Sequence, residues 1–420
     1  MSRVFLYVLA GCVWASPTAA QPLTITAAID EAVRHNLSLL AARSSLTIAD
    51  AQMISARLRP NPVASVSADH LDLLGTGFDE TNNGGPPEIA VRVDIPLERG
   101  GKRDARIAVA TAVRSEAEAQ FADAVRTLRQ DVTLACVDVM AAQALHDLMA
   151  DTLRTYEELA RVNKARVVAG SIPGFEATRS EVAMLQFRAT VVRAELDLAR
   201  ATAQLRTLLG RPPESPIEIA DALEGAGREQ TGDDIAAVES VALRSRPDLL
   251  ALQLAQARSI ADLRLQEALG RVDYTIGAEY RRQQGLSGRS NSLGFFFSTP
   301  LPILNRNQGE IARADAERDQ NRQLIEARRA QVIADVRSAH HDYVVTRELV
   351  AGIERDLLAP AGRARDISSY TYKAGGGTLL ELLDSQRAFN ETMQTYVDAR
   401  ANLRRTIARL NAAAGSEVVR

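Results

Sequence analysis

Three carboxylates follow closely after two glycine-containing turns, where a carboxylate can cap the helix that begins after the turn. Glu176 follows the turn at 170–174, and Glu381 and Asp384 follow the turn at 375–377. A carboxylate in the first turn of a helix accepts hydrogen bonds from free N–H groups and offsets the helix dipole. Helix capping is therefore one interpretation of all three, and any other role depends on the elements that position them.

The other reactive side chains are scattered. The chain has five His and two Cys, and His340-His341 lies in a predicted helix without carboxylates or Cys in a ligand pattern around it. A packed or solvated pair is the favoured interpretation, and a metal site is the alternative. No nucleophile–base grouping appears. We therefore expect no enzyme, no catalytic residue, no resident metal and no cofactor.

Composition favours an exported protein rich in long helices. Aromatic residues make up only 4% of the chain, and the net charge of −3 offers no basic surface for nucleic acid. Residues 1–20 resemble a signal peptide, with Arg3, an apolar run and a small-residue cleavage site ending at Ala20. Cys12, in Leu9-Ala10-Gly11-Cys12, leaves lipidation as the alternative to cleavage.

The chain contains two copies of one long unit. Gly170, Glu176 and Gly210 return as Gly375, Glu381 and Gly415, each 205 residues later. A unit of this length is too long for a short solenoid repeat. The pattern predicts a pseudo-symmetric protomer.

Each copy holds two short segments that alternate apolar and polar residues. The clearer members are 87–96 and 272–281, and their predicted partners are 62–71 and 293–299, joined by loops at 75–86 and 283–292. About ten residues is the length of a tilted transmembrane strand. We predict two hairpins with four charged residues on their polar faces: Arg92, Asp94, Asp273 and Glu279.

Each hairpin is followed by a predicted helix of unusual length. The segment 102–169 lacks Pro and Gly, and 308–374 contains Pro360 as its one proline. Each helix would be about 100 Å long before a sharp turn sends the chain back. The predicted organisation is as follows: 1–20 signal peptide, 21–61 first helices, 62–97 β-hairpin, 98–210 helical hairpin, 211–247 connector with a short helix near 235–245, 248–271 helix, 272–301 β-hairpin, 302–414 helical hairpin and 415–420 tail.

Four membrane strands cannot stand alone, because open edges in lipid leave backbone groups unsatisfied. Two chains would give eight strands and an interior filled by side chains, whereas three give twelve and a water-filled lumen. The charged polar faces favour three. The predicted fold class is mainly α with a small membrane β-barrel portion: a trimeric 12-stranded β-barrel continued by an α-helical barrel.

This order of elements resembles the TolC family of bacterial outer-membrane efflux channels. The segments Pro96-Leu97-Glu98-Arg99-Gly100-Gly101 and Pro300-Leu301-Pro302-Ile303-Leu304-Asn305 are similar to the CzcC branch, associated with heavy-metal efflux. The resemblance implies a homotrimer in the outer membrane, with a helical barrel in the periplasm. It also implies a periplasmic membrane-fusion adaptor and an inner-membrane RND transporter as partners.

The resemblance also implies roles for residues at the tips of the helical hairpins. Tyr372, Glu381 and Asp384 match gate positions of the second repeat, and Glu176 matches an acidic position of the first. Three copies of Asp384 would form a carboxylate ring at the constriction and attract cations. The family can place a basic residue where this chain has Gly377. The expected adaptor-docking turns contain Gly170, Ile172, Pro173, Gly174, Gly375, Gly376, Gly377 and Leu379.

The leading functional hypothesis is an exit duct of a tripartite pump that exports heavy-metal cations. One alternative is a duct for drugs, other organic solutes or type I protein secretion. An alternative of another class is a periplasmic coiled-coil scaffold without a pore, which leaves the alternating segments unexplained.

Overall fold

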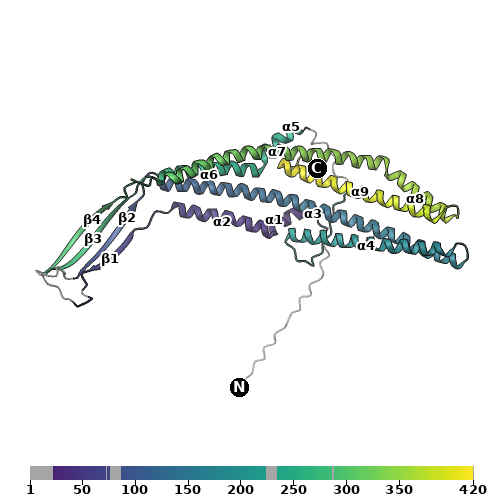
Figure 1. Ribbon diagram of the computed structural model, residues 1–420, viewed down its shortest axis with the longest axis horizontal. Coiled ribbons are helices and arrows are strands. Elements are labelled where there is room, and N and C mark those ends of the chain that lie inside the picture. The colour runs from purple at the N-terminus through teal and green to yellow at the C-terminus, as the bar shows by residue number, and fades with distance from the viewer. Residues whose placement is uncertain (1–21, 72, 76–86, 224–233, 286–287, 420) are drawn as a thin grey trace, which may run out of the picture.

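The computed structural model describes residues 22–71, 73–75, 87–223, 234–285 and 288–419. The molecule is elongated, with a β-sheet at one end and the turns of two long helical hairpins at the other (Figure 1). The predicted signal peptide, including Cys12, lies outside the described residues.

Two similar series of elements make up the protomer. The first comprises α1 (Ile25–His35), α2 (Leu37–Arg57), β1 (Val63–Asp69), β2 (Glu88–Leu97), α3 (Lys102–Val168) and α4 (Gly174–Leu209). The second comprises α5 (Ile235–Ser245), α6 (Pro247–Leu269), β3 (Tyr274–Gly285), β4 (Gly288–Ser298), α7 (Gln308–Asp356), α8 (Leu358–Lys373) and α9 (Leu379–Ala414).

The two series correspond closely in length and in their helix ends. Helices α1 and α5 have 11 residues each, and α4 and α9 have 36 each. Gly210 ends α4 at φ +69° against the end of α1, where an added Cβ would lie 2.4 Å from the His35 carbonyl oxygen. Gly415 ends α9 at the same φ beside Ser245, at the end of α5. Helix α5, predicted as part of the connector, is therefore the counterpart of α1.

The four strands form one antiparallel sheet in the order β1-β2-β3-β4. Both predicted hairpins are present, and β2 also pairs with β3, with Val93 opposite Ala278. The predicted loop at 283–292 was wrong for most of its residues, because β3 extends to Gly285 and β4 begins at Gly288. The ladder supplies the hydrogen bonds of this polar stretch, which outweighs its weak strand propensity.

The two faces of the sheet differ in chemistry. One face carries Ile89, Val91, Val93 and Ile95, each 41–52% exposed. Phe295 and Phe297 of β4 belong to the same face and are also exposed. The opposite face carries charged side chains that are less exposed and paired with one another. A sheet that exposes its apolar face and shields its polar face suits lipid outside and water inside.

The second long helix differs from its prediction. A single helix was expected over 308–374, but the chain breaks at Leu357, between α7 and α8. The cause is Pro360, which lacks an N–H and whose ring would collide with the carbonyl group of Asp356 in a continuous helix. The counterpart α3 has no proline and runs unbroken for 67 residues.

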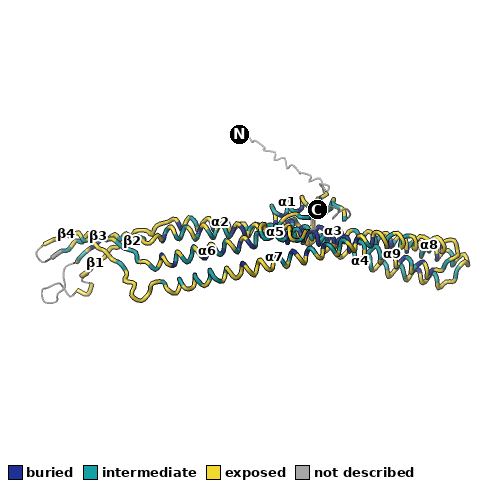
Figure 2. Tube along the Cα trace, turned by 90° about the horizontal axis from the view of Figure 1, so that it is seen from above, coloured by how far each residue is buried: buried dark blue, intermediate teal, exposed yellow. Residues whose placement is uncertain are grey.

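Buried residues gather near the middle of the long axis, where α1 and α5 lie beside the long helices (Figure 2). One cluster joins α1, α3 and α4 around Val132, Cys136 and Leu205, and another joins α5, α7 and α9 around Val336, Tyr343 and Leu410. By length and composition α3 could also cross a membrane, and 44% of its most apolar window is buried within the protomer.

A buried arginine fixes the junction between α5 and α6 in the second repeat. Arg246, 5% exposed, binds both carboxylate oxygens of Asp248 through Nε and Nη2, and donates through Nη1 to Asp335 of α7 at 2.9 Å. Burial alone would raise the pKa of Asp248, but the hydrogen bonds and charge of Arg246 hold that pKa below its ordinary value. The Asp248 carboxylate therefore stabilises the fold above its unfolded pKa, and this stabilisation is lost as the pH falls through the lowered pKa.

We expect Arg246→Met to destabilise the protein by about 3 kcal/mol, because it removes both hydrogen bonds of Arg246 from Asp248 and leaves Arg328, 3.7 Å away, as the cation beside that carboxylate. The measurement is the midpoint of thermal or denaturant unfolding of the purified protein. Arg244→Met is the matched control, since Arg244 is exposed in the last turn of α5, two residues before Arg246. Equal midpoints for the two variants would contradict the assigned role of Arg246.

Candidate functional site: the tips of the helical hairpins

Both hairpins turn at their tips through a left-handed glycine. After α3, Gly170 has φ +69° and the Ser171 N–H donates to the Arg166 carbonyl at 2.8 Å. After α8, Gly375 has φ +81° and the Gly376 N–H donates to the Thr371 carbonyl at 2.9 Å. These bonds satisfy the last carbonyl groups of each helix and make each turn compact.

Glu381 has the structural role that its position after a turn suggests. It forms a capping box with Thr378: the Thr378 N–H donates to Oε2 of Glu381 at 2.9 Å, and the Glu381 N–H donates to Oγ1 of Thr378 at 3.2 Å. The hydrogen bonds from Thr378 hold the pKa of Glu381 below its ordinary value. The cap is thus kept at neutral pH and is lost only as the pH falls through that lowered pKa.

The other two predicted carboxylates are not engaged in this way. Asp384 is exposed on α9, one turn after Glu381, and makes no hydrogen bond or ion pair with any residue that the structure describes. Glu176 is half-buried in the first turn of α4, where its N–H donates to the Pro173 carbonyl. Asp384 is the carboxylate that remains able to face solvent or a second chain.

Tyr372 joins the two tips inside one protomer. It is 5% exposed, and its hydroxyl group donates to Oδ1 of Asn163 on α3 at 2.6 Å. The guanidinium group of Arg166 lies 5.5 Å from the centre of the Tyr372 ring and donates to the Lys373 carbonyl at 3.2 Å. Sequence analysis did not identify Asn163 or Arg166, because their partners lie more than 200 residues away along the chain.

These contacts bring the positively charged side chain of Arg166, on α3, to the tip of the second repeat. Arg166 of the first repeat contacts Tyr372 and Lys373, just before the turn of the second repeat that contains Gly377. Gly377 itself is tightly packed, since an added Cβ would lie 3.3 Å from the Tyr372 backbone nitrogen.

Most residues of the expected docking turns are exposed, and one of them is buried. Pro173, Gly174, Gly375 and Gly376 are exposed, and Ile172 and Gly377 are half-buried. Leu379, expected in the exposed turn, is 4% exposed and packs with Tyr372 and Leu382. The correction has a simple reason: an apolar side chain in the first turn of a helix covers the core behind the turn. Beside this cluster lies a groove of about 640 Å³ between α3, α8 and α9.

The polar face of the sheet forms a second group of predicted site residues. Arg92 donates to Asp94 at 2.8 Å and lies over the Phe296 ring at 4.1 Å. Gly277 makes room for this pair, because an added Cβ would lie 2.2 Å from Oδ1 of Asp94. A neighbouring arginine, Arg281, contacts both Glu279 and Glu88.

Asp273, predicted on the same face, lies just before β3 at the junction with the helices. Its carboxylate accepts hydrogen bonds from the Arg99 N–H at 2.9 Å and from Lys102 Nζ at 2.7 Å. These bonds fix the start of α3 to the start of β3. Asp273 therefore has a structural partner at the junction and does not belong to the strand face.

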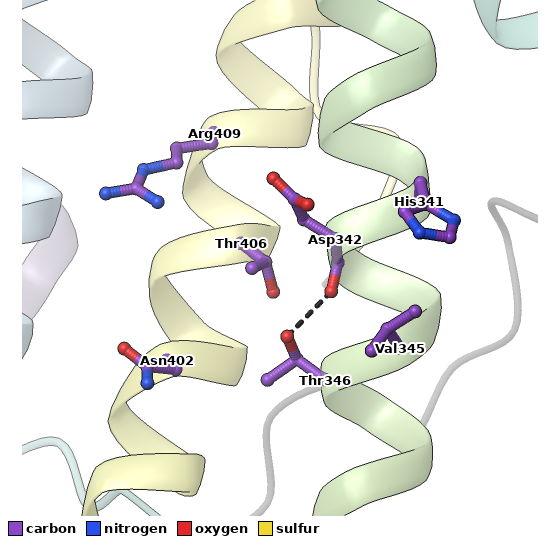
Figure 3. Close-up of a pocket in the computed structure, with 7 residues that line it drawn as sticks. All are labelled: His341, Asp342, Val345, Thr346, Asn402, Thr406 and Arg409. Atoms are coloured by element: carbon purple, nitrogen blue, oxygen red, sulfur yellow. Dashed lines mark hydrogen bonds between the residues drawn. The ribbon is translucent and has the colours of Figure 1, made fainter.

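The predicted histidine pair lies on α7. His341 lines a shallow pocket of about 270 Å³ between α7 and α9, with Asp342 and Arg409 among its other residues. The His341 ring and the Arg409 side chain point away from each other, and the one bond drawn runs from Thr346 Oγ1 to the Asp342 carbonyl (Figure 3). Within the described ranges no three His, Cys, Asp or Glu side chains form a group that could hold a metal ion.

Comparison with known proteins agrees with this architecture. A family model described as outer membrane efflux protein matches residues 28–211 and 238–416. The cobalt-zinc-cadmium resistance protein CzcC of Cupriavidus metallidurans is 27% identical over 390 residues, which cover 90% of this chain and 87% of the relative. The pyoverdine export outer membrane protein OpmQ of Pseudomonas aeruginosa is 25% identical, covering 91% and 81%.

The fold also matches solved channels. The open state of the Neisseria gonorrhoeae MtrE outer membrane channel superposes with a TM-score of 0.75 at 18% identity, covering 94% of this chain and 89% of that one. The chain belongs to the outer membrane efflux protein family. The expected TolC-type efflux channel in the outer membrane, with its helical part in the periplasm, is thereby confirmed. The family is one of channels and not of enzymes.

We expect Tyr372→Phe to loosen the tip, because it leaves the buried Oδ1 of Asn163 without a donor at a cost of about 1–3 kcal/mol. The measurement is amide hydrogen exchange over residues 370–383, which should become faster. Tyr370→Phe is the matched control, since Tyr370 is 75% exposed two residues earlier. Unchanged exchange in Tyr372→Phe would show that the hydrogen bond does not hold the tips together.

Proposed function

We propose that the chain is one third of a closed efflux duct, a homotrimer that exports heavy-metal cations and is gated at the tips of its helical hairpins. The observation that carries the proposal is the shape of the protomer: it is an open wall whose layers all end in unpaired edges. The wall becomes a tube only when further copies complete it.

The order of elements is the same along most of the wall. The strands follow the order β1-β2-β3-β4, and α2 leads into β1, α3 follows β2, α6 leads into β3 and α7 follows β4. In the helical layer α2 contacts α3, α3 contacts α6 and α6 contacts α7. The outer members at one edge are therefore β1 and α2, and at the other edge β4 and α7. Rotational symmetry joins these two different edges head to tail.

The helices at the edges carry apolar side chains that the protomer leaves in solvent. In the half of the wall that ends in the hairpin tips, the order of helices is α4-α3-α9-α8. Helices α4 and α8 are therefore the edge helices there. Helix α4 exposes Val182, Leu185, Val192 and Leu196, and α8 exposes Ile367 and Tyr370. Contiguous exposed apolar surface on a soluble part of a protein marks a contact with another chain. Closure of the ring covers these side chains.

Three copies fit the sheet better than two. The described strands place four acidic and two basic side chains on the polar face: Asp69, Glu88, Asp94, Glu279, Arg92 and Arg281. An eight-stranded barrel has room only for packed side chains, whereas twelve strands leave a lumen that water can fill. The excess of acid also favours cations over anions in that lumen.

The gate proposal rests on the free carboxylate at the tip. Glu381 is committed to its capping box, so Asp384 is the second-repeat carboxylate available to form a ring of three. The Tyr372–Asn163 bond keeps the tip of each protomer as one unit, which lets the three tips move or close together. The neighbouring turns and the groove beside them suit a periplasmic adaptor, which would link the duct to an inner-membrane RND pump.

We expect Asp384→Asn to lower the cation preference of the channel and to raise its resting conductance, because it removes charge and hydrogen-bond acceptors from the constriction. The measurement is single-channel current and reversal potential in planar bilayers. Glu391→Gln is the control, since this exposed residue lies on the same face about 10 Å further from the tip. If both variants match the wild type, the constriction does not lie at Asp384.

Two observations support heavy-metal cations as the exported solute: the similarity to CzcC and the net acidic polar face of the sheet. CzcC is named for cobalt, zinc and cadmium resistance, and OpmQ for pyoverdine export. The net acidic polar face of this sheet suits small cations passing through without being held. An organic siderophore or drug needs no such charge excess.

We expect deletion of the gene to make cells more sensitive to zinc, cobalt and cadmium, because a pump-dependent resistance fails when its exit duct is lost. The measurement is growth over a concentration series of each metal, with restoration by the wild-type gene. Hydrophobic drugs serve as the comparison. Greater sensitivity to drugs than to metals would favour the organic-solute duct.

A further inference from the structure

The junction between β4 and α7 carries an apolar projection that the protomer leaves uncovered. Leu301, Ile303 and Leu304 lie between the last strand and the long helix and are 72–89% exposed. The corresponding stretch of the first repeat, residues 97–101, is shorter and carries one aliphatic side chain, Leu97, which is 42% exposed. Pseudo-symmetry therefore does not require the projection.

The backbone of this junction is held firmly, so its exposed side chains are not the result of a loose loop. Arg306 Nε donates to the Pro302 carbonyl at 3.0 Å, and Gln308 donates to the Leu304 carbonyl. Asn307, at φ +64°, donates to both the backbone and side-chain oxygens of Gln266 on α6. Polar groups bind inward to the protomer while three aliphatic side chains are held outward.

A second exposed apolar site lies at the opposite edge of the same level. Ile54 and Leu58, at the end of α2 and just before β1, are 65% and 62% exposed. The two sites stand at the two ends of the strand order, since β4 is the last strand and β1 the first. They are too far apart to cover each other within one chain.

We infer that the β4–α7 junction of one protomer clasps the end of α2 of the next, with Leu301, Ile303 and Leu304 packing on Ile54 and Leu58. The inference rests on the proposed trimer and goes beyond it. Continuing the antiparallel alternation of the sheet sets β4 against β1 of the neighbour. The end of β4 at Ser298 then lies beside the start of β1 at Val63. The segment after β4 meets the segment before β1, and both expose aliphatic side chains there.

The clasp would stabilise the trimer where the sheet meets the helices. In the sheet, backbone hydrogen bonds join neighbouring chains, and in the helical layer packed helix faces join them. The junction is the place where one kind of contact ends and the other begins. Apolar contact there shields the last strand pairs from water. A second copy is favoured over lipid as the occupant, because aliphatic side chains are exposed at both edges of the protomer at the level where strands meet helices. Contact with lipid would not require exposed aliphatic side chains at both edges.

Cysteine cross-linking of the full-length trimer tests the clasp. The variant combines Leu58→Cys with Ile303→Cys in a Cys136→Ala background; the native thiol is buried, which raises its pKa to about 12, and the substitution removes it altogether. Mild oxidation should give covalent trimers on non-reducing gels. The control pair is Leu58→Cys with Leu74→Cys, since Leu74 is 91% exposed at the far end of the sheet, about 23 Å along the strand. That pair should remain uncross-linked.

The outcomes separate the clasp from the trimer beneath it. Light scattering in detergent gives the number of chains independently of any cross-link. A trimer in which Leu58→Cys/Ile303→Cys fails to cross-link, and in which Ile303→Cys reacts only with a membrane-soluble maleimide, would assign the projection to lipid and overturn the clasp. A monomer by light scattering would overturn the closed duct as well.

A second variant measures how much the clasp contributes. Replacing Leu301, Ile303 and Leu304 together by Ser leaves the inward hydrogen bonds of the junction unchanged, since these use other groups. We expect the ratio of trimer to monomer after mild heating in detergent to fall at least about tenfold. Leu73→Ser with Leu74→Ser is the matched control and should leave the ratio unchanged. An equal ratio in both variants would contradict the clasp.

Discussion

The central constraint on this protein is that a backbone edge cannot stand open in lipid. The four strands satisfy one another internally, but β1 and β4 each keep an outer row of N–H and C=O groups without a partner among the described strands. Closing those edges with further copies dictates the order of everything attached to them. The helices follow the strand order because each long helix enters or leaves the sheet directly, and so the edge of the sheet becomes the edge of the periplasmic wall.

The two repeats build a long molecule from the same few kinds of helix–helix contact. Small side chains and leucines on the long helices pack along their length, and the larger buried clusters gather where α1 and α5 cover the long helices. The two copies then differ in two places. Pro360 breaks the outer helix of the second repeat, and the longer β4–α7 junction carries more exposed aliphatic side chains than the corresponding stretch of the first.

At the tip of the second repeat, two similar carboxylates have different surroundings. Two carboxylates of the second repeat lie three residues apart, yet one is consumed by a capping box and the other stays free. The aromatic ring beside them does not face solvent; it hydrogen-bonds to Asn163 and ties the first repeat to the second. A rigid tip within each protomer is thus combined with an exposed carboxylate, Asp384, on its surface.

The sequence by itself determined the duplication, the long helices, the period-two strands and the positions of both turns, because each is written in local spacing, in glycine and proline, or in apolar period. Only the tertiary structure decided what depends on distant partners. Leu379 is buried by Tyr372, Asp273 is bound by Lys102, and Tyr372 meets Asn163 and Arg166 from the other repeat. Such contacts join residues more than a hundred positions apart, except within the Leu379 cluster. No local sequence pattern specifies which side chain of one hairpin will contact a given side chain of the other.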